Sequence, residues 1–180
     1  EKPTLLDVGC AQARLFELMN ERTDLNYVGI DRDEQRTNLA IQRYGSFPNF
    51  KVIRDCIQNI EIKNVDMVVA LETLEHVPEK EIFGILDIIA GLDPGLFVCT
   101  VPIEIGPAVL LKNTFSKFSG CRRHKKYTLS ETLWASLYQL HRVQPHQGSH
   151  KGFDWRWLLH TISLSMKITG HRASIRRADS

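Results

Sequence analysis

Short apolar runs alternate, through the first half of this chain, with stretches whose apolar residues recur at helical spacing. This alternation is how successive strand–helix units read when the strands join one parallel sheet. Residues 65–71 are almost all apolar, as expected of a strand buried on both faces of a sheet. The sequence therefore predicts an α/β fold of the doubly wound, Rossmann-like type, with a mainly parallel sheet and helices on both faces. The expected strands are Thr4–Val8, Asn26–Ile30, Phe50–Ile53, Val65–Leu71 and Leu96–Val101, with helices at Arg14–Asn20, Asp33–Tyr44 and from Pro78 onward.

The second half of the chain is less regular. Residues 103–127 are predicted to form a long irregular excursion, and such insertions in compact domains are usually functional or disordered. We expect a short helix at Ala108–Asn113, a helix capped by Thr128 or Ser130 that runs to Leu140, a helix at Asp154–Ser163, and a last strand at Met166–Ile175.

Bulk composition is that of a single globular domain. The chain has 180 residues, and its net charge of +2 neither requires nor excludes an anionic partner. The four cysteines show no paired or zinc-like spacing, which favours a reducing compartment. No apolar run reaches the roughly 18 residues of a membrane span, and no signal peptide is evident. We therefore expect a cytoplasmic location and no membrane span.

Three carboxylates, Asp7, Asp31 and Asp55, fall at the ends of predicted strands. Gly9 and Ala11 keep large side chains off the tight turn after the first strand, so the backbone there can approach a ligand closely. Asp31 follows about twenty residues later, where an acidic side chain can accept hydrogen bonds from both hydroxyls of a ribose. The pattern indicates a nucleoside-containing ligand at the carboxyl ends of the strands.

The first turn argues against a dinucleotide. The G-x-G-x-x-G pattern of nicotinamide and flavin sites needs glycine at its second position, so that the pyrophosphate can come near. Here its three glycine positions hold Gly9, Ala11 and Arg14. A ligand without pyrophosphate suits this turn better, and S-adenosylmethionine, with an adenosine and an amino-acid tail, has no phosphate.

Four segments in order resemble one family. Leu5–Gly9, Asp31, Asp55 and above all Leu71–Pro78 are similar to class I S-adenosylmethionine-dependent methyltransferases of the broad methyltransferase-11/23 grouping. The similar stretch runs roughly from Thr4 to Pro102, and it departs from the family at Ala11, where glycine is usual. The resemblance implies a single methyltransferase domain over residues 1–180. Residues 1–102 would be its cofactor-binding half and residues 103–180 its acceptor-binding half.

The resemblance also implies roles for particular residues. Asp7 would orient the first loop and contact the amino group of the cofactor through water, and Gly9 would lie against its methionine tail. Asp31 would bind the ribose, Asp55 the adenine amino group, and the Leu71 carbonyl the ammonium. The expected cofactor-binding residues are Asp7, Gly9, Ala11, Asp31, Arg32, Asp55, Cys56 and Leu71, with Cys56 or Ile57 beside the adenine ring.

Glu72, Glu75 and His76 follow the fourth predicted strand at spacings that share one face of a helical turn. Two carboxylates and an imidazole can bind a divalent cation or act as a base. The small-RNA 2′-O-methyltransferases of plants and bacteria have a similar Glu-x-x-Glu-His set with a later His, which His150 resembles. We expect His76, Glu72 and His150 to be catalytic, and take all four residues as candidate ligands of a divalent metal ion. The alternative is a packed His76 with capping or solvated carboxylates and no metal.

The basic segment Arg122–Tyr127 lies after the fifth predicted strand, where relatives bind their acceptors. Arginine forks suit phosphate or carboxylate, although a solvated loop is the alternative. We therefore favour methyl transfer to a small-molecule or glycosyl acceptor, which this segment would suit if the acceptor is anionic. A metal-assisted RNA 2′-O-methyltransferase is weaker, because net charge is modest and no aromatic–basic RNA platform is seen. A non-catalytic S-adenosylmethionine-binding module is the third reading.

Overall fold

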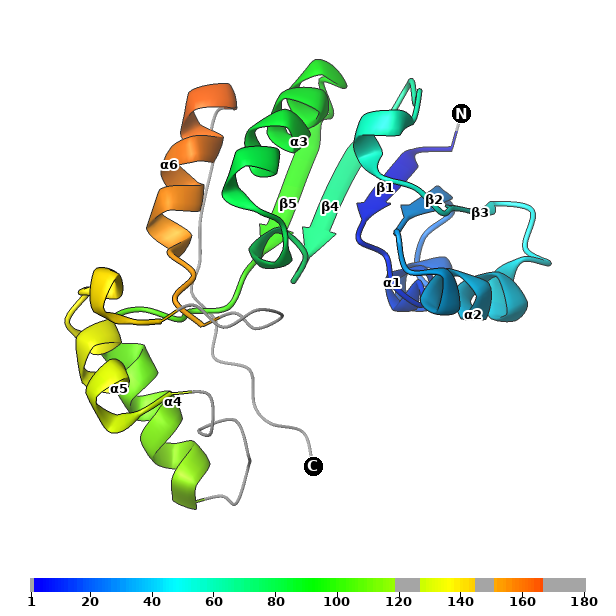
Figure 1. Cartoon of the computed structure of the whole chain (residues 1–180). Coiled ribbons are helices and arrows are strands. Elements are labelled where there is room, and N and C mark those ends of the chain that lie inside the picture. The colour runs from blue at the N-terminus through cyan, green and yellow to red at the C-terminus, as the bar shows by residue number, and fades with distance from the viewer. Residues whose placement is uncertain (1, 119–126, 145–150, 167–180) are drawn as a thin grey trace.

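The computed structural model describes residues 2–118, 127–144 and 151–166. Within these ranges the strands are β1 (Thr4–Val8), β2 (Asn26–Ile30), β3 (Phe50–Ile53), β4 (Met67–Leu71) and β5 (Leu96–Thr100). All are parallel and form one sheet in the order β3–β2–β1–β4–β5 (Figure 1). The central strand β1 pairs with β2 and β4, with Leu5 opposite both Tyr27 and Met67. The predicted doubly wound parallel sheet is confirmed.

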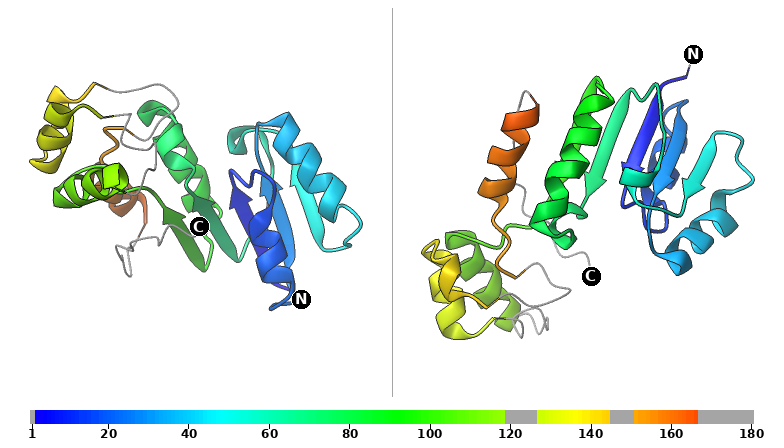
Figure 2. Two further views of the ribbon diagram at one scale, coloured as in Figure 1. Left: turned by 90° about the horizontal axis from the view of Figure 1, so that it is seen from below. Right: turned by 45° about the horizontal axis from the view of Figure 1, so that its top comes forward.

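Helices cover both faces of this sheet (Figures 1 and 2). The α-helices are α1 (Arg14–Asn20), α2 (Glu34–Tyr44), α3 (Glu79–Gly91), α4 (Pro107–Phe118), α5 (Leu129–Ser136) and α6 (Trp155–Ser165). Short 3-10 turns are η1 (Ile57–Asn59), η2 (Leu74–His76) and η4 (Leu140–Arg142). The cores on the two faces are separate: α1 and α2 pack on one, and α3 and α6 on the other.

Strand alternation explains the two cores, because successive side chains point to opposite faces. Leu6 and Val8 of β1 pack with α3 and α6, whereas Leu5 packs with Phe16 of α1 and Tyr27 of β2. Fully burying one such side chain contributes about 1.5–3 kcal/mol. The face of α3 that packs on the sheet consists of buried apolar residues at helical spacing, Ile82, Ile85, Leu86 and Ile89.

Helix α4 is longer than the predicted helix at Ala108–Asn113. Polar residues interrupt its apolar stripe, but Asn113 is buried and donates a hydrogen bond from Nδ2 to Oγ1 of Thr132 on α5, at 3.0 Å. A polar residue thus fills a core position between two helices, which hydrophobic periodicity cannot reveal.

Helix α5 begins as predicted and ends earlier. Thr128 accepts from the Glu131 amide, and the Glu131 side chain accepts from the Thr128 amide, a capping box. The helix ends before Tyr138, whose φ of +62° is left-handed. Its ring lies over Gly106, where an added Cβ would be 2.7 Å from the Tyr138 hydroxyl, so only glycine allows this approach. The chain therefore turns at Tyr138 instead of continuing to Leu140.

Helices α4 and α5 lie side by side beyond the carboxyl end of β5, on the side away from β1–β3 (Figures 1 and 2). The helix predicted at Asp154–Ser163 is α6, with Asp154 as its N-cap. The last strand was predicted at Met166–Ile175. Met166 is the C-cap residue of α6, and the other residues of this stretch lie outside the described ranges. In the described part of the chain, no helix is long and apolar enough to cross a bilayer.

Candidate active site

The loop after β1 is fixed to the end of β2 by its backbone. The amides of Gly9 and Cys10 both donate to the carbonyl of Ile30, at 2.7 and 3.0 Å. Gly9, Ala11 and Ala13 have φ of +79°, +48° and +55°, so every second residue of the loop is left-handed. This conformation favours glycine, yet alanine occupies two of the three positions. Ala13 had not been singled out from the sequence, although the spacing of small residues at 9, 11 and 13 was a usable signal.

Gly9 also lies directly against the turn after β4. A Cβ added to Gly9 would fall 2.3 Å from Oγ1 of Thr73, and the Thr73 hydroxyl itself donates to the Leu71 carbonyl at 3.1 Å. Thr73 thus borders the two groups that were expected to face the methionine tail, Gly9 and the Leu71 carbonyl. Sequence reasoning missed it, because a lone threonine after a strand gives no signal of such a contact.

Asp31 lies at the end of β2, and its carboxylate bridges two backbone segments. Oδ2 accepts from the Ala11 amide and Oδ1 from the Asp33 amide, both at 2.8 Å. These bonds fix the carboxylate against the first loop and the start of α2. An ionised carboxylate has about four acceptor positions, so the two amides leave capacity for ribose hydroxyls.

Asp7 is buried beneath the first loop, on the α1 face of the sheet. Its Oδ2 accepts from the Tyr27 hydroxyl at 2.6 Å. Burial raises the Asp7 pKa to about 6, against the opposing effect of that hydrogen bond. The Asp7 side chain therefore contacts Tyr27 in the core under the loop, and its expected water-mediated contact with the cofactor remains a prediction.

Asp55 organises the turn after β3. Its Oδ1 accepts from the Cys56 amide and from Nδ2 of Asn59, both at 2.7 Å. These hydrogen bonds lower the Asp55 pKa, and the bond from Asn59 has the larger effect. The carboxylate thereby fixes η1, which brings Ile57 into the core and leaves Cys56 half-buried at the turn. Both residues expected beside the adenine are thus held at the carboxyl end of β3.

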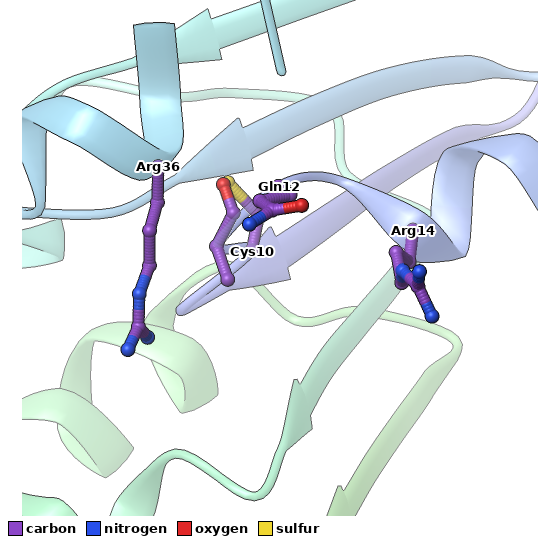
Figure 3. A pocket seen from close by; sticks show the side chains of 5 residues that line it. Cys10, Gln12, Arg14 and Arg36 are labelled. Carbon is purple, nitrogen blue, oxygen red and sulfur yellow. The ribbon is translucent and has the colours of Figure 1, made fainter. Parts of the chain in front are cut away.

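An open pocket of about 420 Å³ lies beside the first loop. Figure 3 shows Arg36 of α2 on one side, Arg14 of α1 on the other, and Cys10 and Gln12 between them. Ala11 completes the lining. Of these residues only Ala11 had been expected to bind cofactor, and Arg32, which had also been expected, is exposed and does not line the pocket.

Glu72, Glu75 and His76 do not share one face, so that expectation was wrong. Glu72 is left-handed, with φ of +53°, and its amide is held by the carbonyl and hydroxyl of Thr100 on β5. The next turn is the 3-10 helix η2, not an α-helix, and it turns Glu75 inward and His76 outward. Burial raises the Glu75 pKa to about 7, with a smaller contribution from the Glu72 charge.

A metal site is not shown by these residues. Among the residues that the structure describes, no three His, Cys, Asp or Glu side chains are grouped so as to hold a metal ion. His150, the fourth candidate ligand, lies outside the described residues, as does the basic segment at 122–126.

The acceptor half is organised by a buried polar network, which we call the polar hub. The Tyr127 hydroxyl donates to Oε2 of Glu104 at 2.9 Å and accepts from the Gly152 amide at 3.1 Å. Lys151 Nζ lies 2.6 Å from Oε1 of Glu131, with the two side chains only 8% and 12% exposed. Lys112 of α4 completes the hub through an ion pair with Glu104. The hub joins α4, α5 and the segment that precedes α6.

Comparison with known proteins agrees with this fold. Residues 5–94 match the model of a methyltransferase domain family. Over 101 residues the chain is 28% identical to a carboxy-S-adenosyl-L-methionine synthase of Glaesserella parasuis. The matched stretch covers 52% of this chain and 42% of that protein. The chain thus spans less than half the length of this curated relative.

Solved structures show the same fold. One is a chain of the complex between the Haloferax volcanii Trm112 methyltransferase activator and a methyltransferase. It is 17% identical to this chain with a TM-score of 0.51, and the match covers 66% of this chain and 52% of that one. Another is the methyltransferase domain of a bacterial protein, CtHen1, with 15% identity, a TM-score of 0.50, and coverage of 55% and 56%. The chain belongs to the methyltransferase domain family, and the predicted class I S-adenosylmethionine-dependent methyltransferase fold is confirmed.

Proposed function

We propose that this protein transfers a methyl group from S-adenosylmethionine to a small-molecule or glycosyl acceptor that carries an anionic group. The observation that carries the proposal is the Asp31 carboxylate, which is fixed by the amides of Ala11 and Asp33 beside the left-handed first loop. A nucleoside would find its ribose partner already oriented there. The proposed cofactor-binding residues are Asp7, Gly9, Ala11, Asp31, Arg32, Asp55, Cys56 and Leu71, to which Thr73 is added.

The cofactor would supply a sulfonium-activated methyl group, so alignment of the acceptor can provide much of the rate. Asp31 would hold the ribose, and Gly9 with the Leu71 carbonyl the amino-acid tail. A base is needed only if the acceptor is a hydroxyl or a protonated amine. His76, exposed just after β4, would take that proton, with Glu72, four residues earlier, and His150 as the further candidates.

The acceptor half supports an anionic acceptor. Residues 103–180 contain 13 basic and four acidic residues, a net charge of +9, whereas residues 1–102 contain 10 and 17, a net charge of −7. Two of the four acids, Glu104 and Glu131, are buried in the polar hub. The positive potential of this half would attract a phosphate or carboxylate group.

Identification of the acceptor is the direct test. The protein would be incubated with methyl-tritiated S-adenosylmethionine and cell extract, and the label followed into RNA, protein, lipid and small-molecule or glycan fractions. We expect the label in the last fraction. Label in RNA would instead support the RNA 2′-O-methyltransferase, and no transfer together with cofactor binding would support a non-catalytic module.

A chelator separates the metal-assisted mechanism from the metal-free one. If Glu72, Glu75, His76 and His150 bind a divalent ion, a chelator abolishes transfer, a divalent ion restores it, and His76→Ala and His150→Ala each abolish it. If His76 acts as a metal-free base, only the His76 variant loses activity and the pH profile shifts. We expect the metal-free result, because Glu75 is buried whereas His76 is exposed, and the described residues contain no group of three His, Cys, Asp or Glu side chains that could hold a metal ion. Cofactor affinity should stay near normal in both variants.

A further inference from the structure

Tyr27 reaches from the middle of β2 to the carboxyl end of β1. In the register of these two strands Tyr27 lies opposite Leu5, and Asp7 is the next residue of β1 on the same face of the sheet. The Tyr27 hydroxyl donates to Oδ2 of Asp7 at 2.6 Å. The two residues are only 1% and 4% exposed, so this hydrogen bond is buried beneath the first loop.

The Tyr27 ring is held on two sides by other aromatic rings. It is stacked on Phe50 of β3, with centroids 5.5 Å apart and planes 5° apart, and its centroid lies 5.3 Å from that of Phe16 on α1. Side chains in such a closely packed core have little freedom to change rotamer. The hydroxyl is therefore fixed in place before any ligand binds.

Asp7 in turn lies directly before the loop that would hold the cofactor. It is two residues from Gly9, whose amide donates to the Ile30 carbonyl at the end of β2. Strand β2 thus holds the start of the loop twice, through the Tyr27 hydroxyl from below and through the Ile30 carbonyl from its own end.

The surroundings of Asp7 are mostly apolar. Val69 of β4 lies opposite it in the sheet, and Phe16 of α1 is buried on the same face. Within the described residues, three titratable groups interact with its carboxyl group: Tyr27, Cys10 and Asp31.

Of these three, Tyr27 is the group that favours the ionised form of Asp7. Burial raises the Asp7 pKa to about 6, the Tyr27 hydrogen bond opposes this rise, and the Asp31 charge adds a smaller one. Burial also raises the pKa of the Cys10 thiol and of the Tyr27 hydroxyl, so both groups are neutral near pH 7.

We propose that Tyr27 is a positioning residue of the cofactor site, whose hydroxyl holds the Asp7 carboxylate in the orientation and charge state that suit a cationic cofactor. This inference rests on the proposed function, in which Asp7 contacts the amino group of the cofactor through water. S-adenosylmethionine carries an ammonium and a sulfonium group, so an ionised carboxylate beneath the loop attracts it and a protonated one does not. Cofactor affinity should therefore fall as the pH is lowered through the Asp7 pKa.

Calorimetry of S-adenosylmethionine binding between pH 5 and 8 tests the proposal. The wild type should lose affinity with a midpoint near the Asp7 pKa of about 6. In Tyr27→Phe the midpoint should move up by about one pH unit, because a hydrogen bond that stabilises the ionised form is lost. Asp7→Asn should remove this step, which identifies it as the titration of Asp7.

Tyr44→Phe is the matched control. The Tyr44 ring belongs to the same aromatic cluster, with its centroid 5.4 Å from that of Phe16, whereas the hydroxyl that Asp7 accepts from is that of Tyr27. The pH profile of this variant should coincide with that of the wild type.

Fluorinated tyrosine keeps the test valid if Tyr27→Phe folds poorly. In a protein whose four tyrosines are replaced by 3-fluorotyrosine, the hydroxyl is a stronger donor, so the midpoint should move to lower pH. A folded Tyr27→Phe variant with the wild-type profile, or with the same loss of affinity at every pH, would overturn the inference and leave the proposed function intact. Failure of the wild type to bind S-adenosylmethionine at any pH would instead overturn the proposed function, and this inference with it.

Discussion

The two halves of this molecule hold their polar groups in different ways. In the cofactor half, Asp31 and Asp55 are fixed largely by backbone amides a few residues away or in the adjoining loop. In the acceptor half, Glu104 is fixed by the side chains of Lys112 and Tyr127. Glu131 is fixed by the Lys151 side chain, from 20 residues away, in addition to the amides of Thr128 and Gln144. The first arrangement follows from strand ends and turns, so it tolerates side-chain changes nearby. The second depends on each partner, because a buried charge that loses its partner is costly.

The largest expected effect is on the stability of the acceptor half. Lys151→Met leaves the buried Glu131 without its ion pair, and we expect the free energy of unfolding in urea to fall by about 3–5 kcal/mol. The double variant Glu131→Gln/Lys151→Met should recover part of that loss, since no charge is left buried alone. A loss below about 1 kcal/mol in the single variant would mean that the pair behaves as an exposed one, and the contrast between the halves would fail.

Cofactor affinity tests the other side of the comparison. Asp31→Ala should weaken S-adenosylmethionine binding, measured by calorimetry, by about 1.5–3 kcal/mol, because a charge-assisted hydrogen bond to the ribose is lost. S-adenosylmethionine and S-adenosylhomocysteine should raise the melting temperature of the wild type, and NAD should not.

Asp33→Ala is the matched control for Asp31. It removes the side chain that accepts from the Arg36 amide and caps α2, so it should cost about 1 kcal/mol of stability with little change in affinity. Unchanged affinity in Asp31→Ala would remove Asp31 from the cofactor site.

Glu75 should make the stability of the cofactor half depend on pH. Its pKa is raised from 4.5 to about 7, so the native state binds more protons than the unfolded state between these values, and stability falls as pH rises through that window. Glu75→Gln should remove this fall and be more stable than the wild type at pH 8 by about 1–3 kcal/mol. Urea titrations of both proteins at pH 5 and 8 measure the difference, with Glu79→Gln, at an exposed carboxylate nearby, as the control. A difference that is the same at both pH values would contradict the assignment.

The smallest effect concerns the strain in the first loop. Ala11 is left-handed, and replacing it with glycine relieves about 1–2 kcal/mol of strain while costing about 0.4–1 kcal/mol of unfolded-state entropy. Ala11→Gly should therefore be neutral or stabilising by up to about 1 kcal/mol, whereas Ala40→Gly within α2 should destabilise by about 1 kcal/mol. Thermal melting of both variants distinguishes the signs, and equal losses would show that the loop is unstrained.

The sequence was sufficient for the framework of the cofactor half. The bounds of β1, α1, β2 and β3 agree with those predicted, because each strand is a short apolar run that ends at glycine or aspartate and α1 has a clear apolar period. The same reasoning located Gly9, Asp31 and Asp55, since residues at the carboxyl ends of parallel strands meet at one edge of the sheet.

Tertiary structure decided what periodicity does not encode. The contact of Thr73 with Gly9, the left-handed Ala13 and the inward turn of Glu75 depend on how the ends of β1 and β4 meet. The burial of Asn113 depends on its hydrogen-bond partner Thr132, which lies on another helix. Local pattern determines which residues form strands and helices, because backbone sterics and hydrophobic period act over a few residues. Which polar side chains are buried together depends on contacts between residues far apart in sequence, so only the folded chain determines them.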